Sequence, residues 1–267
     1  MAPLPDRDPL PTCVKNLAPL PDAYVATVRA GLDAALRDGD PSAAAGLTEA
    51  QFEAIGDHVR LLLAWNEAVN LSGISRPEMI AREHVLDSLA AVPLLRRARI
   101  GEFVDLGSGG GYPGLPLALT LPARRALLVE SIAKKARFLT VAVDAVGIGD
   151  CVAVLAARAE AVAADPDHRG RWQAVVARAV AELPELSELS LPLMRIGGLL
   201  VAWKRRPLDD ELGRSEPALR RLGGRIAAVE PVTVPGLEDH VLVVVEKVAE
   251  TPPEFPRCPA ARRRRPL

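Results

Sequence analysis

The segment that most restricts the fold is residues 103–114, which read FVDLGSGGGYPG. An apolar run typical of a buried strand leads directly into a glycine-rich turn, and a segment suited to a helix follows at about residues 115–119. Glycine permits positive φ and close approach of the backbone to a ligand, and amides at a helix start can bind an anionic group. Open α/β sheets bind ligands at this point. The segment therefore predicts an α/β fold with a ligand-binding loop.

The chain from residue 101 onward alternates short apolar runs with amphipathic segments, which is typical of βαβ units around a parallel sheet. Five strands are predicted at residues 103–106, 126–129, 152–155, 174–176 and 199–203. Two later β-rich segments, 225–234 and 241–248, are separated only by a short turn. We expect these two segments to form an antiparallel hairpin on the edge of the sheet.

The first hundred residues carry helical signals instead. Apolar residues recur at helical spacing over residues 23–37, before a break at 38–41. Thr48 and Gln51 form a capping-box pattern that predicts the start of a second helix. Residues 75–78 show the same capping-box pattern, with proline at the first helical position. They predict a helix that continues to about residue 95.

These patterns divide the chain into four parts. They are a flexible extension at 1–21, which holds six prolines, an N-terminal helical cap at 22–100, a sheet-bearing domain at 101–248, and a basic C-terminal tail at 249–267. No apolar run reaches the ~18 residues of a membrane helix, and the N-terminus does not resemble a signal peptide, so a cytoplasmic location is expected. Three widely separated cysteines predict free thiols and no metal site.

The glycine loop fits two cofactor patterns. A dinucleotide pattern begins at Gly109, but this frame starts late after the strand and places Pro113 inside the turn. The other frame, with Asp105, Gly107, Gly109 and Gly111, fits S-adenosylmethionine, because Asp105 can accept from the ammonium group and the loop amides can bind the carboxylate. Glu130, 23 residues past Gly107, can accept from both ribose hydroxyls. The spacing of Asp105, the three glycines and Glu130 favours S-adenosylmethionine. A glycine-rich turn without a ligand is the remaining alternative.

Further motifs carry a resemblance to a known family. In chain order they are Trp65-Asn66-x-x-x-Asn70-Leu71-Ser72, Arg82-x-His84-x-x-Asp87-Ser88-Leu89, the loop continued through Tyr112-Pro113-Gly114-Leu115-Pro116, Glu130-Ser131-x-x-Lys134-Lys135-x-x-Phe138-Leu139, Val175-Val176-Ala177-Arg178-Ala179, Trp203-Lys204 and Phe255-Pro256-Arg257. Over about residues 24–267 the chain resembles the RsmG (GidB) family.

The resemblance implies a class I S-adenosylmethionine-dependent methyltransferase fold, with a Rossmann-like, mostly parallel sheet, an antiparallel C-terminal hairpin and an N-terminal helical cap. It implies transfer of a methyl group to N7 of one guanine in 16S ribosomal RNA. By matching position, it also implies cofactor contacts at Gly107, Tyr112, Ala159, Glu160 and Arg178.

Methyl transfer to guanine N7 does not require a catalytic acid or base. Guanine N7 has an in-plane lone pair and no proton to remove, so in-line alignment can supply roughly 7–11 kcal/mol of barrier reduction. We therefore assign no catalytic acid or base. His84 and Asp87 share a helix face, and two interpretations stay open. They form a catalytic pair, or His84 belongs to the core while Asp87 anchors the glycine loop or a helix end.

The basic residues indicate how RNA would bind. A net charge of −1 argues against a protein that coats nucleic acid, so local clusters matter more. The expected RNA contacts lie at the ligand-binding end of the sheet and in the tail: Lys134, Lys135, Arg137, Lys204, Arg205, Arg206, Arg262, Arg263, Arg264 and Arg265. The expected partner is 16S ribosomal RNA or the small subunit, bound by a monomer. The alternatives are a methyltransferase acting on a small molecule and a non-catalytic RNA-binding module.

Overall fold

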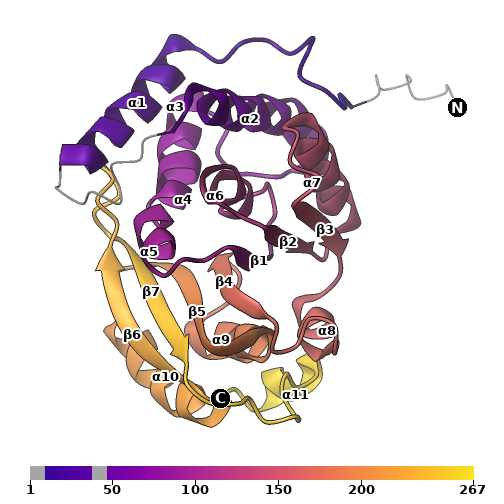
Figure 1. The fold of residues 1–267 in the computed structure, drawn as a ribbon, viewed down its shortest axis with the longest axis vertical. Coiled ribbons are helices and arrows are strands. Elements are labelled where there is room, and N and C mark those ends of the chain that lie inside the picture. Colours follow the sequence, from indigo (N-terminus) through magenta and orange to yellow (C-terminus); the bar gives the residue numbers. More distant parts are fainter. Residues whose placement is uncertain (1–9, 38–46) are drawn as a thin grey trace, which may run out of the picture.

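The computed structural model describes residues 10–37 and 47–267 and contains one seven-stranded sheet with helices on both faces (Figure 1). The strand order is β3-β2-β1-β4-β5-β7-β6. The strands are β1 Glu102–Leu106, β2 Arg125–Glu130, β3 Val152–Ala156, β4 Trp172–Arg178, β5 Met194–Arg205, β6 Gly224–Pro231 and β7 His240–Lys247. The five predicted strands and the antiparallel hairpin at the edge are confirmed. The predicted break at 38–41 and the first nine residues lie outside the described residues.

Strands β1 to β5 pair in parallel, so their carboxyl ends meet at one edge of the sheet. Asp105 pairs with Leu128 of β2 on one side and Val176 of β4 on the other, which places it in the centre of the sheet. The central strands β1, β2 and β4 are buried on both faces because helices cover both. This topology brings the residues that follow β1, β2, β4 and β5 to the same edge.

Two helical layers cover the sheet (Figure 1). One layer contains α1 Asp22–Arg37, α2 Glu49–Val69, α3 Pro77–Ile80, the π-helix η1 Ala81–Leu86, α4 Asp87–Leu89, α5 Val92–Arg97, α6 Gly114–Thr120 and α7 Ala133–Ala145. The other contains α8 Ala159–Ala164, α9 Leu183–Ser190, the short 3-10 helix η2 Leu191–Leu193, α10 Asp209–Leu222 and α11 Pro259–Arg264. Each layer packs against one face of the sheet and forms its own hydrophobic cluster there. Among the described helices, none is long and apolar enough to cross a membrane.

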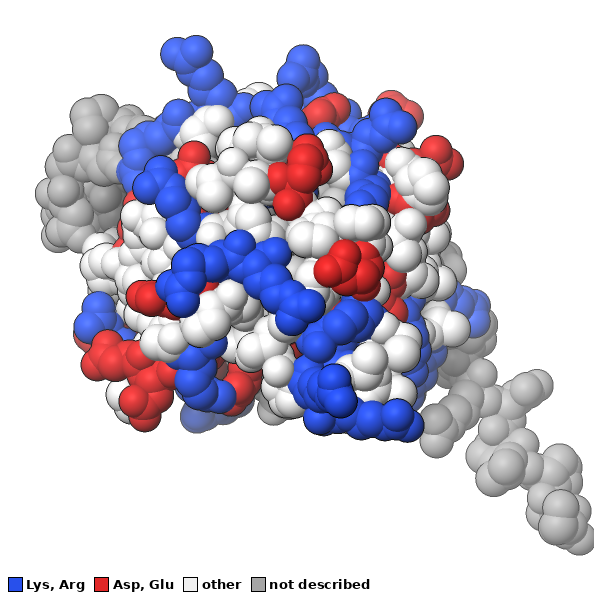
Figure 2. Space-filling model, turned by 90° about the horizontal axis from the view of Figure 1, so that it is seen from below, with Lys and Arg blue, Asp and Glu red and all other residues white. Residues whose placement is uncertain are grey.

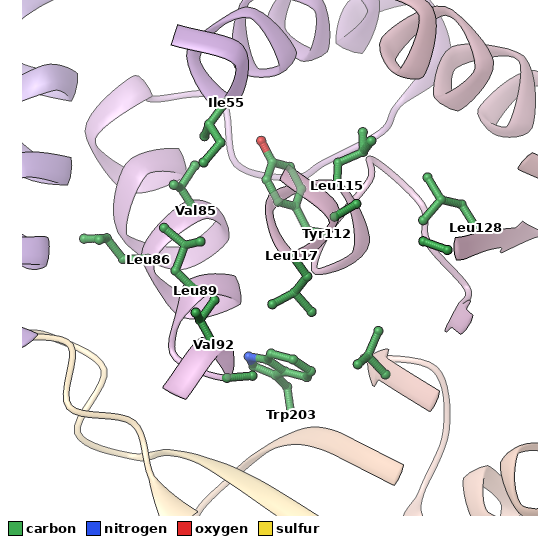
Figure 3. Packing of buried hydrophobic residues seen from close by; sticks show 14 of the residues in the cluster. Ile55, Val85, Leu86, Leu89, Val92, Tyr112, Leu115, Leu117, Leu128 and Trp203 are labelled. Carbon is green, nitrogen blue, oxygen red and sulfur yellow. The ribbon is translucent and has the colours of Figure 1, made fainter. Parts of the chain in front are cut away.

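The N-terminal helices share their core with the sheet. Figure 3 shows Leu89 and Val92 of these helices and Leu117 of α6 around the indole of Trp203, which comes from β5. The indole nitrogen of Trp203 also donates to the carbonyl of Asp87 at 2.8 Å. The positions of these helices are therefore fixed relative to the end of β5.

Two details of the N-terminal helices bear on the sequence predictions. The capping box at Thr48 is confirmed, because its hydroxyl accepts from the amide of Gln51 at 3.2 Å. The second predicted capping box is wrong, since Arg76 occupies the N-cap position and makes no side-chain cap. The predicted helix is also divided by the π-helix, which inserts an extra residue per turn, and π-bulges often occur at functional sites.

Residues 10–21, which belong to the segment expected to be flexible, and the basic C-terminal tail both contact the helical layers. In residues 10–21 the backbone carbonyls of Val14 and Ala18 accept from Arg60 at 3.0 and 2.9 Å, and that of Pro11 accepts from Trp65 at 2.8 Å. Proline keeps this segment from forming a helix, which leaves its carbonyls open to side-chain donors. At the other end, the expected tail contains α11 and packs beside α9.

Candidate functional site

The loop after β1 closes back on its own strand. Gly107, Gly109 and Gly111 have φ values of +73°, +55° and +90°, a region that side chains with a Cβ rarely adopt. The amide of Gly114 donates to Oδ2 of Asp105 at 3.0 Å, and a Cβ at Gly114 would lie 2.4 Å from that oxygen. The loop conformation therefore depends on glycine at these positions.

Asp105 is a fully buried carboxyl group with one free oxygen. Its Oδ1 has no hydrogen-bond partner within the described part of the chain. Burial raises the pKa of Asp105 to about 7, against the opposing effect of hydrogen bonds from Ser108 and Gly114. A buried carboxylate oxygen without a donor is costly, and an ammonium group would supply one. Asp105 therefore fits the ammonium group of S-adenosylmethionine.

Glu130 ends β2 and is 6% exposed. Its Oε2 accepts from the amide of Gly109 at 3.0 Å, and its Oε1 accepts from the amide of Ile132 at 2.8 Å. The carboxylate thus ties the glycine loop to the start of α7. Each carboxylate oxygen has further acceptor capacity, so the group still fits a pair of ribose hydroxyls.

Tyr112 stands between two histidines, although sequence reasoning singled out only His84. Its buried ring lies 4.6 Å from the ring of His58 and 4.8 Å from that of His84, between centroids. The Nε2 atom of His58 donates to the carbonyl of Gly110 at 2.7 Å. Burial lowers the pKa of His58 to about 4, so its ring is neutral and holds the loop by this hydrogen bond. Its position on the apolar face of α2 was the available signal.

Asp87 is the centre of a polar network that also includes His84. The Oδ2 atom of Asp87 accepts from Nη1 of Arg178 at 2.9 Å, and Oδ1 accepts from Nδ1 of His240 at 2.9 Å. Arg178 also donates to Nδ1 of His84 at 3.2 Å, and Nε2 of His84 then donates to Ser72. Burial and the charge of Arg178 lower the pKa of His84 to about 4. Asp87 therefore anchors Arg178 and His240 rather than the glycine loop.

A cleft of about 360 Å³ opens beside this network. It is lined by Glu83, Asp87, Arg178, Ala179, Trp203, Lys204, Arg205 and His240. His240 was missed by sequence reasoning, but β7 begins there and pairs with Arg205 at the end of β5. The cleft thus lies at the sheet edge that carries Asp105 and Glu130, between the sheet and the π-helix.

The predicted cationic residues fall into two groups. Lys134, Arg137, Arg205, Arg206, Arg263, Arg264 and Arg265 are exposed, and Lys135 is half-buried. Lys204 and Arg262 differ from the expectation of free RNA contacts. Lys204 forms a 2.6 Å ion pair with Glu211, and its side chain is only 12% exposed.

Arg262 is buried, with Glu185 at 3.1 Å and Glu160 at 3.7 Å. Its charge is therefore compensated inside the protein. Ala159 and Glu160 begin α8, which follows β3 at the cofactor edge. One oxygen of Glu160 is buried and has no hydrogen-bond partner among the described residues. Within the described residues no group of three or more His, Cys, Asp or Glu side chains could hold a metal ion.

Comparisons with known proteins agree with this geometry. The family model "rRNA small subunit methyltransferase G" matches residues 51–234. Proteins named ribosomal RNA small subunit methyltransferase G are similar to the chain: that of Roseiflexus sp. (strain RS-1) is 45% identical and that of Chloroflexus aggregans 41%. Each alignment covers 83% of this chain, and 94% and 92% of the relatives. An O-methyltransferase structure from Bacillus cereus in complex with SAH has a TM-score of 0.50 at 15% identity, covering 82% of this chain and 100% of that one. It supports the fold alone, and the predicted fold class is confirmed.

Proposed function

The chain belongs to the rRNA small subunit methyltransferase G family, and from that premise we propose that it methylates N7 of one guanine in 16S ribosomal RNA. It is a methyltransferase, and its cofactor, S-adenosylmethionine, supplies a methyl group on a sulfonium centre. The observation that carries the proposal is the unpartnered oxygen of Asp105, because it lies beside the glycine loop at the sheet edge that also holds the cleft.

The residues of the glycine loop would hold the cofactor. Asp105 would accept from its ammonium group, Glu130 would accept from the ribose hydroxyls, and the amides of the loop would donate to its carboxylate. The family resemblance adds contacts from Tyr112, Ala159, Glu160 and Arg178. In this arrangement Glu130 has two roles, since the same carboxylate already fixes Gly109.

The cleft beside Asp87 would receive the target base. Its volume of about 360 Å³ falls within the range of roughly 300–1,000 Å³ typical of small-molecule sites. Guanine N7 needs no proton transfer, so the walls of the cleft need only align it, and Asp87 fixes two of them by holding Arg178 and His240. The methylated base is cationic, and the Glu83 carboxylate in the cleft wall would stabilise it.

The rim of this site would bind phosphates of the RNA. The exposed side chains of Lys134, Arg137, Arg205 and Arg206 follow the carboxyl ends of β2 and β5, and half-buried Lys135 lies with them. Phosphate contacts position a nucleic acid without reading its sequence. The helical part at 22–100 contributes to the substrate side of the cleft through Glu83 and Asp87, which agrees with its proposed role as a cap.

A methyl-transfer assay tests the proposal. Labelled S-adenosylmethionine would be incubated with the protein and either deproteinised 16S ribosomal RNA or small subunits, and chain cleavage specific for 7-methylguanosine would map the product. We expect one modified guanine, and weakened cofactor binding with strongly reduced transfer in Asp105→Asn. Asp209→Asn, an exposed change on α10, is the control.

Transfer to small molecules with none to RNA would favour the first alternative. Absence of cofactor binding in the wild-type protein would favour a non-catalytic RNA-binding module.

A further inference from the structure

A second cleft lies between α10 and α11 and has a volume of about 670 Å³. Four of the residues that line it are arginines: Arg221, Arg257, Arg264 and Arg265. None of the described lining residues is acidic. This arginine cleft is the larger of the two clefts described here and belongs to no part of the cofactor or base site.

The arginine cleft lies in the helical layer of α8 to α11, on the face of the sheet opposite α6, which follows the glycine loop. Strand β5 ends at the cofactor edge, and α10 then runs back along the sheet, so its last turn, with Arg221, returns to the far edge. Strand β7 is antiparallel to β5, and its last residue, Lys247, donates to the carbonyl of Met194, the first residue of β5. Helix α11 reaches from this end of α10 toward the start of α8, where Arg262 lies 3.7 Å from Glu160.

Buried groups hold the arginines of this cleft in place. The guanidinium carbons of Arg221 and Arg257 lie 5.1 and 5.6 Å from the centre of the buried Phe255 ring. Arg257 also contacts the buried carboxylate of Glu188 at 2.6 Å and donates to the carbonyl of Arg265 at 2.8 Å. The aromatic ring and the carboxylate therefore order this part of the cleft before any ligand binds.

The charges of the cleft are only partly compensated. Glu188 neutralises Arg257, whereas Arg221, Arg264 and Arg265 are exposed and have no acidic partner within 4 Å in the described part of the chain. Figure 2 views the molecule from the side on which α10 and α11 lie and shows Lys and Arg side chains gathered on this face. Planar guanidinium groups bind phosphate oxygens in pairs, which distinguishes them from lysine.

We propose that the arginine cleft binds backbone phosphates of the ribosomal RNA at a distance from the target guanine. The proposal rests on the proposed function, because it takes the substrate to be RNA. The two clefts share no lining residue, so contacts at both require an RNA that is folded and reaches from one to the other. The enzyme then recognises its substrate by the shape of an RNA domain, and a short RNA that carries the target guanine lacks one of the two contacts.

The test compares two triple variants with equal loss of charge. The first is Arg221→Gln with Arg264→Gln and Arg265→Gln. The matched control is Arg214→Gln with Arg220→Gln and Arg225→Gln, whose side chains are exposed but paired with Glu182, Glu216 and Glu246. Binding of deproteinised 16S ribosomal RNA would be measured over a series of salt concentrations, with cofactor affinity and thermal unfolding measured in parallel.

We expect the cleft variant to lower the slope of log affinity against log salt by roughly 2–3, about one for each lost phosphate contact. Its RNA affinity should fall at least about tenfold at moderate salt, while cofactor affinity and the control variant stay near wild type. Methylation of a short RNA hairpin should be equal in the cleft variant and the wild-type protein.

Equal losses in both triple variants, or an unchanged salt slope, would overturn the proposal. A loss seen with intact small subunits but not with deproteinised RNA would also overturn it, because the partner would then be a ribosomal protein. Failure of the proposed function would give a different result, because the wild-type protein itself would then transfer no methyl group to RNA.

Discussion

The Nη1 atom of Arg178 lies 2.9 Å from Oδ2 of Asp87, and this contact joins the end of β4 to the N-terminal helices. The second oxygen of the same carboxylate accepts from His240, so one buried group holds side chains from two strands. The backbone carbonyl of Asp87 also receives the indole of Trp203. Three walls of the cleft beside Asp87 thus meet at one residue of the helical layer.

Replacing Asp87 with Ala should destabilise the protein. The substitution leaves Arg178 without its carboxylate, and loss of one partner of a buried ion pair costs about 3–5 kcal/mol. The side chain of Arg178 is 16% exposed, so we expect the lower end of that range. Denaturant unfolding measures the change, and methyl transfer should fall with it because the cleft walls lose their anchor.

The control for this change is Glu216→Ala, which removes an exposed ion pair with Arg220 and should cost less than about 1 kcal/mol. An Asp87→Ala protein as stable as this control would show that the network does not hold the cleft.

Cofactor affinity should rise with pH because of Asp105. Its pKa is raised to about 7 by burial, so the carboxyl group of the free protein is largely protonated at pH 6 and ionised at pH 8. An ammonium group binds the ionised form, and the affinity should therefore increase about tenfold between these values. Calorimetric titration in two buffers of different ionisation enthalpy would show proton release at pH 6.

The same shift has the opposite effect on the stability of the ligand-free protein. The unfolded chain ionises Asp105 at a pKa of about 4, so stability falls as the pH rises from about 4 to about 7. Asp105→Asn should bind the cofactor weakly and show a flat pH profile in both measurements. Affinity that is constant from pH 6 to 8 in the wild-type protein would contradict the role given to this carboxyl group.

Gly114→Ala should disrupt the glycine loop. The added Cβ would lie 2.4 Å from Oδ2 of Asp105 and 2.5 Å from the side chain of Leu128, both in the buried centre of the sheet. We expect a loss of about 1–3 kcal/mol and weaker cofactor binding, because overpacking displaces the loop. Thermal unfolding and cofactor titration measure the two effects.

Gly213→Ala is the matched control. Gly213 lies in α10, and no atom is within 4 Å of its added Cβ, so alanine should stabilise the helix by about 1 kcal/mol. If Gly114→Ala were stabilised as much as Gly213→Ala, the predicted clash between the added Cβ and Asp105 would not exist.

The sequence predicted what depends on local pattern. Parallel strands buried on both faces are continuous apolar runs, so β1, β2 and β4 were found to within a few residues. The glycine loop and Glu130 followed from their positions after such strands. The same reasoning located Arg178, because it also follows a strand.

Contacts between distant parts of the chain were not predictable in this way. His240 and Asp87 are 153 residues apart. They meet because β7 inserts between β5 and β6, which places His240 beside the helix that follows the π-helix. The charges of Lys204 and Arg262 were visible in the sequence, but their acidic partners were not. Sequence alone therefore overestimated how many cations face solvent.

Arg262 should behave differently from its neighbours in the C-terminal helix. Its guanidinium contacts Glu185 of α9 and Glu160 of α8, and the side chain is 8% exposed. Arg262→Ala leaves both carboxylates without this partner and should lower stability by about 1–3 kcal/mol. It should also raise the KM for S-adenosylmethionine. Ala159 and Glu160 are at the start of α8, and the family resemblance implies that both contact the cofactor.

The exposed neighbour Arg263 provides the comparison. Arg263→Ala should leave stability within about 0.5 kcal/mol of wild type, since surface substitutions rarely do more. Arg262→Lys should restore part of the stability lost in Arg262→Ala, because lysine keeps the charge but loses the paired geometry. Neither change at Arg262 should alter the salt slope of RNA binding. A reduced slope in Arg262→Ala, with stability intact, would mean that the buried guanidinium reaches RNA and that its carboxylate partners do not hold it.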